Sequence, residues 1–85
     1  MNTNARLSKK TTACLASSFE YLRKSERLAL LEFWFAFIDG VLCGLEAEGI
    51  VAKEQARKII DQRDRVYGER CGELMKNEIK NPTAL

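Results

Sequence analysis

Apolar residues recur along three stretches of the chain at intervals of three and four residues. In TTACLASSFEYL (11–22), Leu15, Phe19 and Leu22 occupy positions i, i+4 and i+7. The second stretch begins at Leu28 and the third follows Gly49. This spacing places apolar side chains on one face of an α-helix, and no stretch alternates as a half-buried strand would. The pattern predicts an all-α fold.

Capping residues and helix breakers set the expected boundaries. Thr11 or Thr12 is expected to cap the first helix and Ser25 the second, since their hydroxyls can accept a bond from the first turn. Gly49 stands where a helix ends in a left-handed residue, and Pro82 cannot continue the third helix.

The chain therefore divides into a basic arm, one helical domain and a short tail. The arm is expected to be flexible. The predicted ranges are 1–10 for the arm, 11–80 for the domain with helices at 11–23, 26–48 and 52–78, and 81–85 for the tail.

The second predicted helix carries three stripes at heptad spacing. Its first apolar stripe is Leu28, Leu31, Phe35, Ile38, Leu42 and Leu45, and its acidic stripe is Glu32, Asp39 and Glu46. Its second apolar stripe is Leu30, Phe33, Trp34, Phe37 and Val41. A helix that is apolar on two faces must be covered on both.

The third helix is expected to cover the first apolar stripe. A short turn at Gly49 makes the two long helices an antiparallel hairpin. In the register that pairs apolar residues, Asp39 faces Arg63 and Glu32 faces Arg70. We therefore interpret the acidic stripe as internal ion pairs that fix the register.

The second apolar stripe remains partly uncovered in this arrangement. A short first helix reaches about half of the long one, because a helix rises 1.5 Å per residue. We predict an elongated helical bundle that forms a homodimer, with Phe33, Trp34, Phe37 and Val41 at the seam. Gly40 and Gly44 would let a second helix approach closely.

The apolar stretch from Leu28 is long enough to raise the question of a membrane span. Glu32 and Asp39 lie inside it, and an acid near the centre of a span costs about 2.5–3.5 kcal/mol. With Glu46, these acids line one stripe, which a membrane span has no reason to keep polar. We predict no membrane partner.

The composition excludes several chemistries. The chain has no histidine, which removes imidazole metal ligands and the commonest general base. Its three cysteines form no C-x-x-C pair, and an odd number does not favour a secreted disulfide framework. No glycine-rich phosphate loop is present. We expect no metal, no cofactor and no enzyme activity, and a cytoplasmic location.

Nucleic acid is the alternative partner, although the net charge is only +2. The segment around Gly49 does not fit a helix-turn-helix, because Gln55 stands where a buried aliphatic residue is needed. Binding would instead use the arm and the third helix, through a basic face of Arg6, Lys9, Lys10, Lys53, Arg57, Lys58 and Arg65.

Together these patterns suggest a small protein that acts by binding another protein, as an adaptor, inhibitor or regulatory subunit. A regulator of this size would suit a phage or a plasmid. The expected interface, with a protein partner or a second copy, is Leu30, Phe33, Trp34, Phe37, Gly40, Val41 and Gly44.

Overall fold

The computed structural model describes residues 7–80, with side chains up to residue 77. It contains three helices, α1 (Lys9–Arg23), α2 (Leu28–Ala47) and α3 (Lys53–Lys80), and no strand within the described range. The all-α prediction is confirmed for these residues.

The basic arm is shorter than expected. Lys9 and Lys10 already belong to α1, whereas residues 1–6 and the predicted tail lie outside the described residues. The remaining helix ends fall within two residues of the predicted ones.

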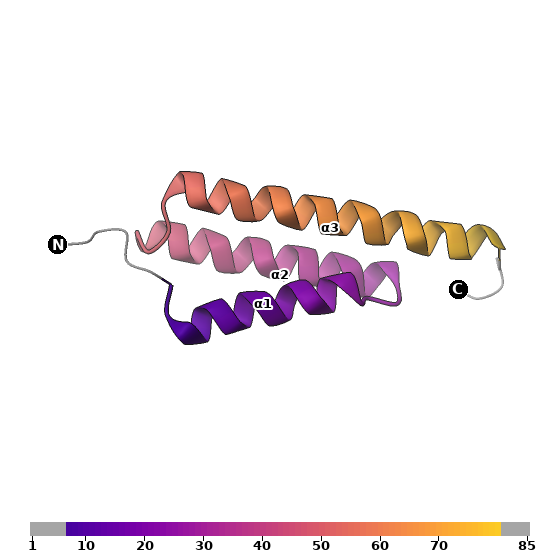
Figure 1. The fold of residues 1–85 in the computed structure, drawn as a ribbon, viewed down its shortest axis with the longest axis horizontal. Helices are drawn as coiled ribbons and strands as arrows, with labels where there is room; N and C mark the ends of the chain where they lie inside the picture. The colour runs from indigo at the N-terminus through magenta and orange to yellow at the C-terminus, as the bar shows by residue number, and fades with distance from the viewer. Residues whose placement is uncertain (1–6, 81–85) are drawn as a thin grey trace.

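The three helices run up, down and up along one long axis (Figure 1). The molecule measures 57 × 21 × 15 Å, and its Cα radius of gyration is 15.1 Å. The longest helix, α3, continues past the turn that joins α1 to α2. The bundle is therefore elongated, and each helix keeps a long side facing outward.

Two predicted caps are wrong. Ser8 precedes α1 with an extended backbone, and its Oγ accepts a bond of 3.0 Å from the N–H of Thr11. Ser25 is buried, and its hydroxyl donates to the carbonyl of Tyr21 at 2.7 Å. Arg27 precedes α2 without a side-chain cap. Ser25 thus closes the end of α1, because its side chain points back along that helix.

Gly49 ends α2 as predicted. Its φ of +72° lies in the left-handed region that favours glycine. The N–H of Ile50 bonds the carbonyl of Leu45 at 2.9 Å, and the N–H of Gly49 bonds that of Glu46 at 3.0 Å. These two bonds form a Schellman motif, which satisfies the last carbonyls of the helix and turns the chain toward α3.

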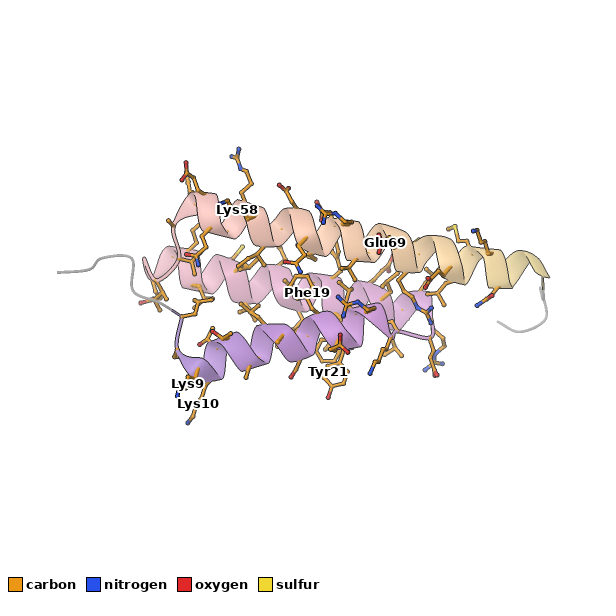
Figure 2. The ribbon with its side chains drawn as sticks, in the orientation of Figure 1. Lys9, Lys10, Phe19, Tyr21, Lys58 and Glu69 are labelled. Carbon is orange, nitrogen blue, oxygen red and sulfur yellow. The ribbon has the colours of Figure 1, made fainter. Side chains whose placement is uncertain are left out.

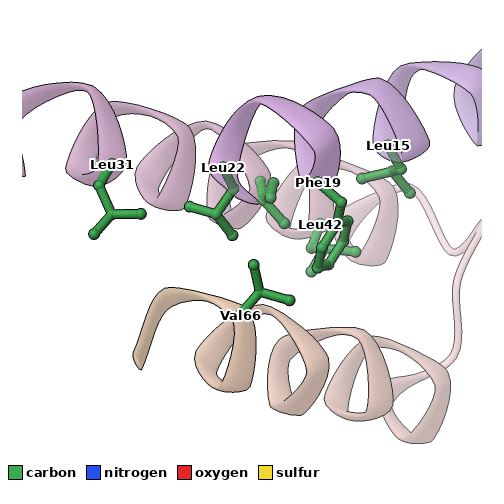
Figure 3. Close-up of a cluster of buried hydrophobic side chains, with 7 residues drawn as sticks. Leu15, Phe19, Leu22, Leu31, Leu42 and Val66 are labelled. Carbon is green, nitrogen blue, oxygen red and sulfur yellow. The ribbon is translucent and has the colours of Figure 1, made fainter. Parts of the chain in front are cut away.

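The core lies along the line where all three helices meet (Figure 3). Leu22, Leu31 and Ile38 are completely buried. The side chains from α1 enter the space between α2 and α3 instead of lying over the second apolar stripe alone. The buried cluster is Leu15, Phe19, Leu22, Leu31, Ile38, Leu42 and Val66. The core uses one side of α2 and leaves the opposite side free.

Candidate functional site

The free side of α2 is apolar and exposed. Leu30 is 39% exposed, Phe33 55% and Phe37 37%, although each lies within one turn of a buried core residue. Neither α1 nor α3 covers them. Large apolar side chains that are exposed together, instead of singly, make this side of α2 a candidate interaction site.

Two residues of the predicted seam are less exposed than the others. Trp34 and Val41 are only partly exposed and pack against the core cluster. The Trp34 ring stacks on the ring of Tyr21 from α1, with centroids 4.7 Å apart. The second apolar stripe is therefore split, because α1 covers its inner edge and leaves Leu30, Phe33 and Phe37 outside.

The exposed rings form one cluster around Trp34. Phe33 meets Trp34 edge to face at 5.0 Å, and Phe37 meets it at 5.3 Å. Tyr21 completes the cluster, is 55% exposed and points away from α3 (Figure 2). We call the set of Tyr21, Leu30, Phe33, Trp34 and Phe37 the aromatic surface.

Sequence reasoning missed Tyr21. It stands one residue before buried Leu22 and off the stripe that indicates the core of α1. The one feature of the sequence that could have indicated its role is an aromatic side chain next to that stripe, on the side of α1 that faces α2.

Gly40 and Gly44 lie on the C-terminal half of α2, next to a hollow. The hollow has a volume of about 470 Å³ and lies between α1 and α2. A Cβ added at either glycine would meet nothing within 4 Å. The lining residues are Lys10, Thr11, Cys14, Gly40, Val41, Gly44, Leu45 and Glu48.

One of the two predicted ion pairs is present. Arg63 Nη1 lies 3.1 Å from Asp39 Oδ1, and its guanidinium also stacks on the Phe35 ring, 3.7 Å from the centroid. The pairing of Glu32 with Arg70 is wrong. Arg70 Nε instead donates to the carbonyl of Ser25 at 2.7 Å. The register is thus held by one buried arginine and by a bond to the α1–α2 turn.

Burial raises the pKa of Tyr67 above its ordinary value of 10.0, and the neighbouring Cys71 and Glu32 raise it further. Cys14 and Cys43 are exposed thiols, and Cys71 is half-buried. Within residues 7–80, no three His, Cys, Asp or Glu side chains gather where they could hold a metal ion.

The basic residues do not converge on one face. Lys58 lies on the outer side of α3, whereas Lys9 and Lys10 lie at the opposite side of the molecule, at the start of α1 (Figure 2). Lys53, Arg57 and Arg65 are exposed on α3, where Glu54 and Asp61 stand among them, and Arg6 is outside the described residues.

Helix α2 is also long and apolar enough, by length and composition alone, to cross a membrane. Only Leu31, Ile38 and Leu42 are fully buried among its residues. The core helix of a water-soluble protein passes the same test of length and composition.

Comparison of the chain with protein-family models, with curated proteins and with solved structures finds no match.

Proposed function

We propose that this chain is a non-catalytic protein that acts by binding another protein through the aromatic surface, as an adaptor, inhibitor or regulatory subunit. One observation carries the proposal: Phe33 and Phe37 gather around Trp34 outside a core that is complete without them. Clustered aromatic residues of this kind supply most of the binding energy at protein interfaces.

The exposed area indicates what kind of partner is needed. At about 200 Å² for a fully exposed aromatic residue, Tyr21, Phe33 and Phe37 leave about 300 Å² uncovered. Covering this area contributes about 7 kcal/mol, and association costs about 4–15 kcal/mol. Because this gain lies within the range of that cost, the aromatic surface alone leaves little net affinity. Its partner must therefore bring apolar side chains of its own.

The charges of α2 indicate what charge a partner should carry. Asp39 keeps about half of its side chain exposed despite its pair with Arg63, and Glu32 is exposed on the same stripe. From residue 28 to residue 47, α2 carries acids and no base. A partner that extends from the aromatic surface over these acids would match them with basic side chains, whereas a partner confined to the aromatic surface needs none. The same proposal includes a homodimer in the cytoplasm.

The test is capture of partners from the protein's own cell lysate by tagged variants. Phe33→Glu and Phe37→Glu each place a charge in the aromatic surface, so we expect each to lower the captured protein at least tenfold. Met75→Glu is the matched control, because Met75 is 49% exposed on α3, outside the aromatic surface. Circular dichroism of each variant checks that the helices remain.

Nuclease treatment decides between the two classes of partner. Material that survives nuclease and is lost with Phe33→Glu supports protein binding. Material that disappears with nuclease, and with Arg57→Glu or Lys58→Glu, would contradict the proposal and support binding of nucleic acid through α3.

A further inference from the structure

The free side of α2 has a second periodicity. One set of its exposed residues follows alternating intervals of three and four, as at the contact positions of a coiled coil, with exposed Ala29, Ala36 and Cys43 beside it. Each of them is exposed in the structure. We call this set the outward seam: Leu30, Phe33, Phe37, Gly40, Gly44 and Ala47.

Side-chain size changes along the outward seam. Its N-terminal half carries large side chains, with Phe33 the most exposed at 55%. Its C-terminal half carries Gly40, Gly44 and Ala47, beside the hollow of about 470 Å³. One half of the seam therefore projects, whereas the other half is recessed.

We propose that a second copy of this chain covers the outward seam, with the two α2 helices antiparallel. Phe33 then lies over the partner's Gly44, and Phe37 lies over the partner's Gly40. In the same antiparallel register, Leu30 meets the partner's Ala47. The inference rests on the proposed function, because it takes the free side of α2 as a protein-binding surface, and it commits that surface to a self-complementary partner.

The antiparallel direction follows from the sizes. In a twofold-symmetric dimer the same patch serves both subunits, so it must contain both the projection and its recess. An antiparallel pair brings every large residue of the seam opposite a small one. A parallel pair would set Phe33 against Phe33 and Gly44 against Gly44, which crowds one end and leaves a void at the other.

The exposed aromatic side chains supply part of the area that a dimer of two copies needs. Tyr21, Phe33 and Phe37 leave about 300 Å² of aromatic surface on each chain, or about 600 Å² in a dimer. This is about half of the 1,200 Å² at the lower end of stable interfaces. Leu30, the hollow and the small residues of the seam lie in the same contact and add to it.

The acids of α2 favour a protein over a lipid surface. Helices that lie on membranes carry lysine and arginine on the polar side. Here Glu32 and Asp39 are exposed on α2, and no basic residue lies between residues 28 and 47. The acids stand on the α3 side of the helix, away from the outward seam, so they do not oppose a second copy there.

A size exchange tests the pairing by sedimentation equilibrium over a dilution series. Gly44→Phe places a ring where the partner's Phe33 must lie, so we expect the dissociation constant of the dimer to rise about 100-fold. Phe33→Ala leaves a void and is expected to raise it by a similar factor. The double variant, with both changes, places the large side chain at residue 44 and the small one at residue 33. Its dissociation constant should be at least tenfold lower than that of either single variant.

The substitution at Gly44 is not expected to disturb the fold of the single chain. A side chain at Gly44 meets nothing within 4 Å, and phenylalanine is a better helix former than glycine. Gly68→Phe is the matched control, because Gly68 is also an exposed glycine with free space, on α3. It should leave the dissociation constant unchanged.

Direction is tested by disulfide formation in the background Cys14→Ser, Cys43→Ser and Cys71→Ala. When Leu30→Cys and Ala47→Cys chains are mixed, an antiparallel pair links unlike chains and a parallel pair links like chains. Links between like chains would overturn the proposal.

A chain that stays monomeric at all concentrations would overturn the pairing, and co-sedimentation of that monomer with phosphatidylcholine vesicles would show lipid as the occupant. Neither result would contradict the proposed function, which is tested separately by capture of a protein from lysate and its loss with Phe33→Glu. Failure of the dimer and failure of the proposed function are thus separate outcomes.

Discussion

Arg63 joins α2 and α3 through both an ion pair and packing. Its side chain is 8% exposed, and it donates to Asp39 on α2 and to Asp64 on its own helix. The same guanidinium stacks on Phe35. A planar group with five donors can do both at once, which the point charge of a lysine cannot.

The two members of the Asp39–Arg63 pair should differ in their effect on stability. We expect Arg63→Ala to lower the free energy of unfolding by about 2–3 kcal/mol, since it removes buried packing as well as charge. Asp39→Ala should cost less than about 1 kcal/mol, because half of its side chain is exposed. Urea unfolding measures both, and equal losses would show that the ion pair, not the stacking, fixes the helices.

Tyr67 reports the packing between α2 and α3. Its ring lies 4.8 Å from that of Phe35, and burial, then Cys71 and Glu32, raise its pKa. The folded chain holds the neutral phenol longer than the unfolded chain does. Stability should therefore be unaffected well below pH 10 and fall as the pH rises through the raised pKa.

Phenolate absorbance in a Tyr21→Phe background isolates Tyr67. The added change Glu32→Gln removes one of the causes, so it should move the pKa partly back toward its ordinary value. An unchanged pKa in the Glu32→Gln protein would rule out that charge as a cause.

At the scale of the element, the two turns are fixed by different means. The α2–α3 turn depends on the backbone of Gly49, which adopts a positive φ. The α1–α2 turn depends on side chains, because Ser25 bonds the end of α1 and its carbonyl receives Arg70 from α3. The α2–α3 turn is therefore determined by neighbouring residues in the sequence. The bonds of the α1–α2 turn to α3 form only after the helices have packed.

Glycine to alanine changes should have opposite effects on stability in a turn and in a helix. Gly49→Ala should lower the free energy of unfolding by about 1–2 kcal/mol, because a Cβ is strained at this φ. Gly68→Ala, in an exposed turn of α3 with free space, should raise it by up to about 1 kcal/mol. Thermal unfolding of the two variants should shift in opposite directions, and a shared direction would contradict this assignment.

The same distinction explains what could be predicted from the sequence. Periodicity and Gly49 indicate the helices and the α2 end, and an antiparallel register brings Asp39 to Arg63. The partner of Arg70 could not be predicted, since the carbonyl of Ser25 reaches it only through the folded α1–α2 turn. Ser8 was missed as a cap because Thr11 and Thr12 fit the same local rule.

The candidate site divides in a similar way. The pattern places Phe33 and Phe37 on a face that the hairpin leaves free, and both are exposed. Heptad spacing cannot separate them from Trp34 and Val41, because the line between covered and free is set by where α1 lies. Tyr21 joins the surface for the same reason, through its stack on Trp34.

At the scale of the whole molecule, the shape decides how much surface is free. A chain 57 Å long and 15 Å thick cannot surround α2 with only two other helices. The side of α2 that faces away from α1 and α3 stays open along its length. This is why a short chain can hold a complete core and still present a long apolar face.

The short turns at residues 24–27 and 48–52 also determine the order of events in time. Helices joined by short turns meet at little cost in loop entropy, and bundles with such local contacts fold in microseconds to milliseconds. Encounter with a partner depends on concentration and is slower in dilute solution. Under the proposed pairing, each newly folded chain spends an interval with its outward seam bare, during which it is exposed to nonspecific aggregation. The cellular concentration of the chain would set the length of that interval.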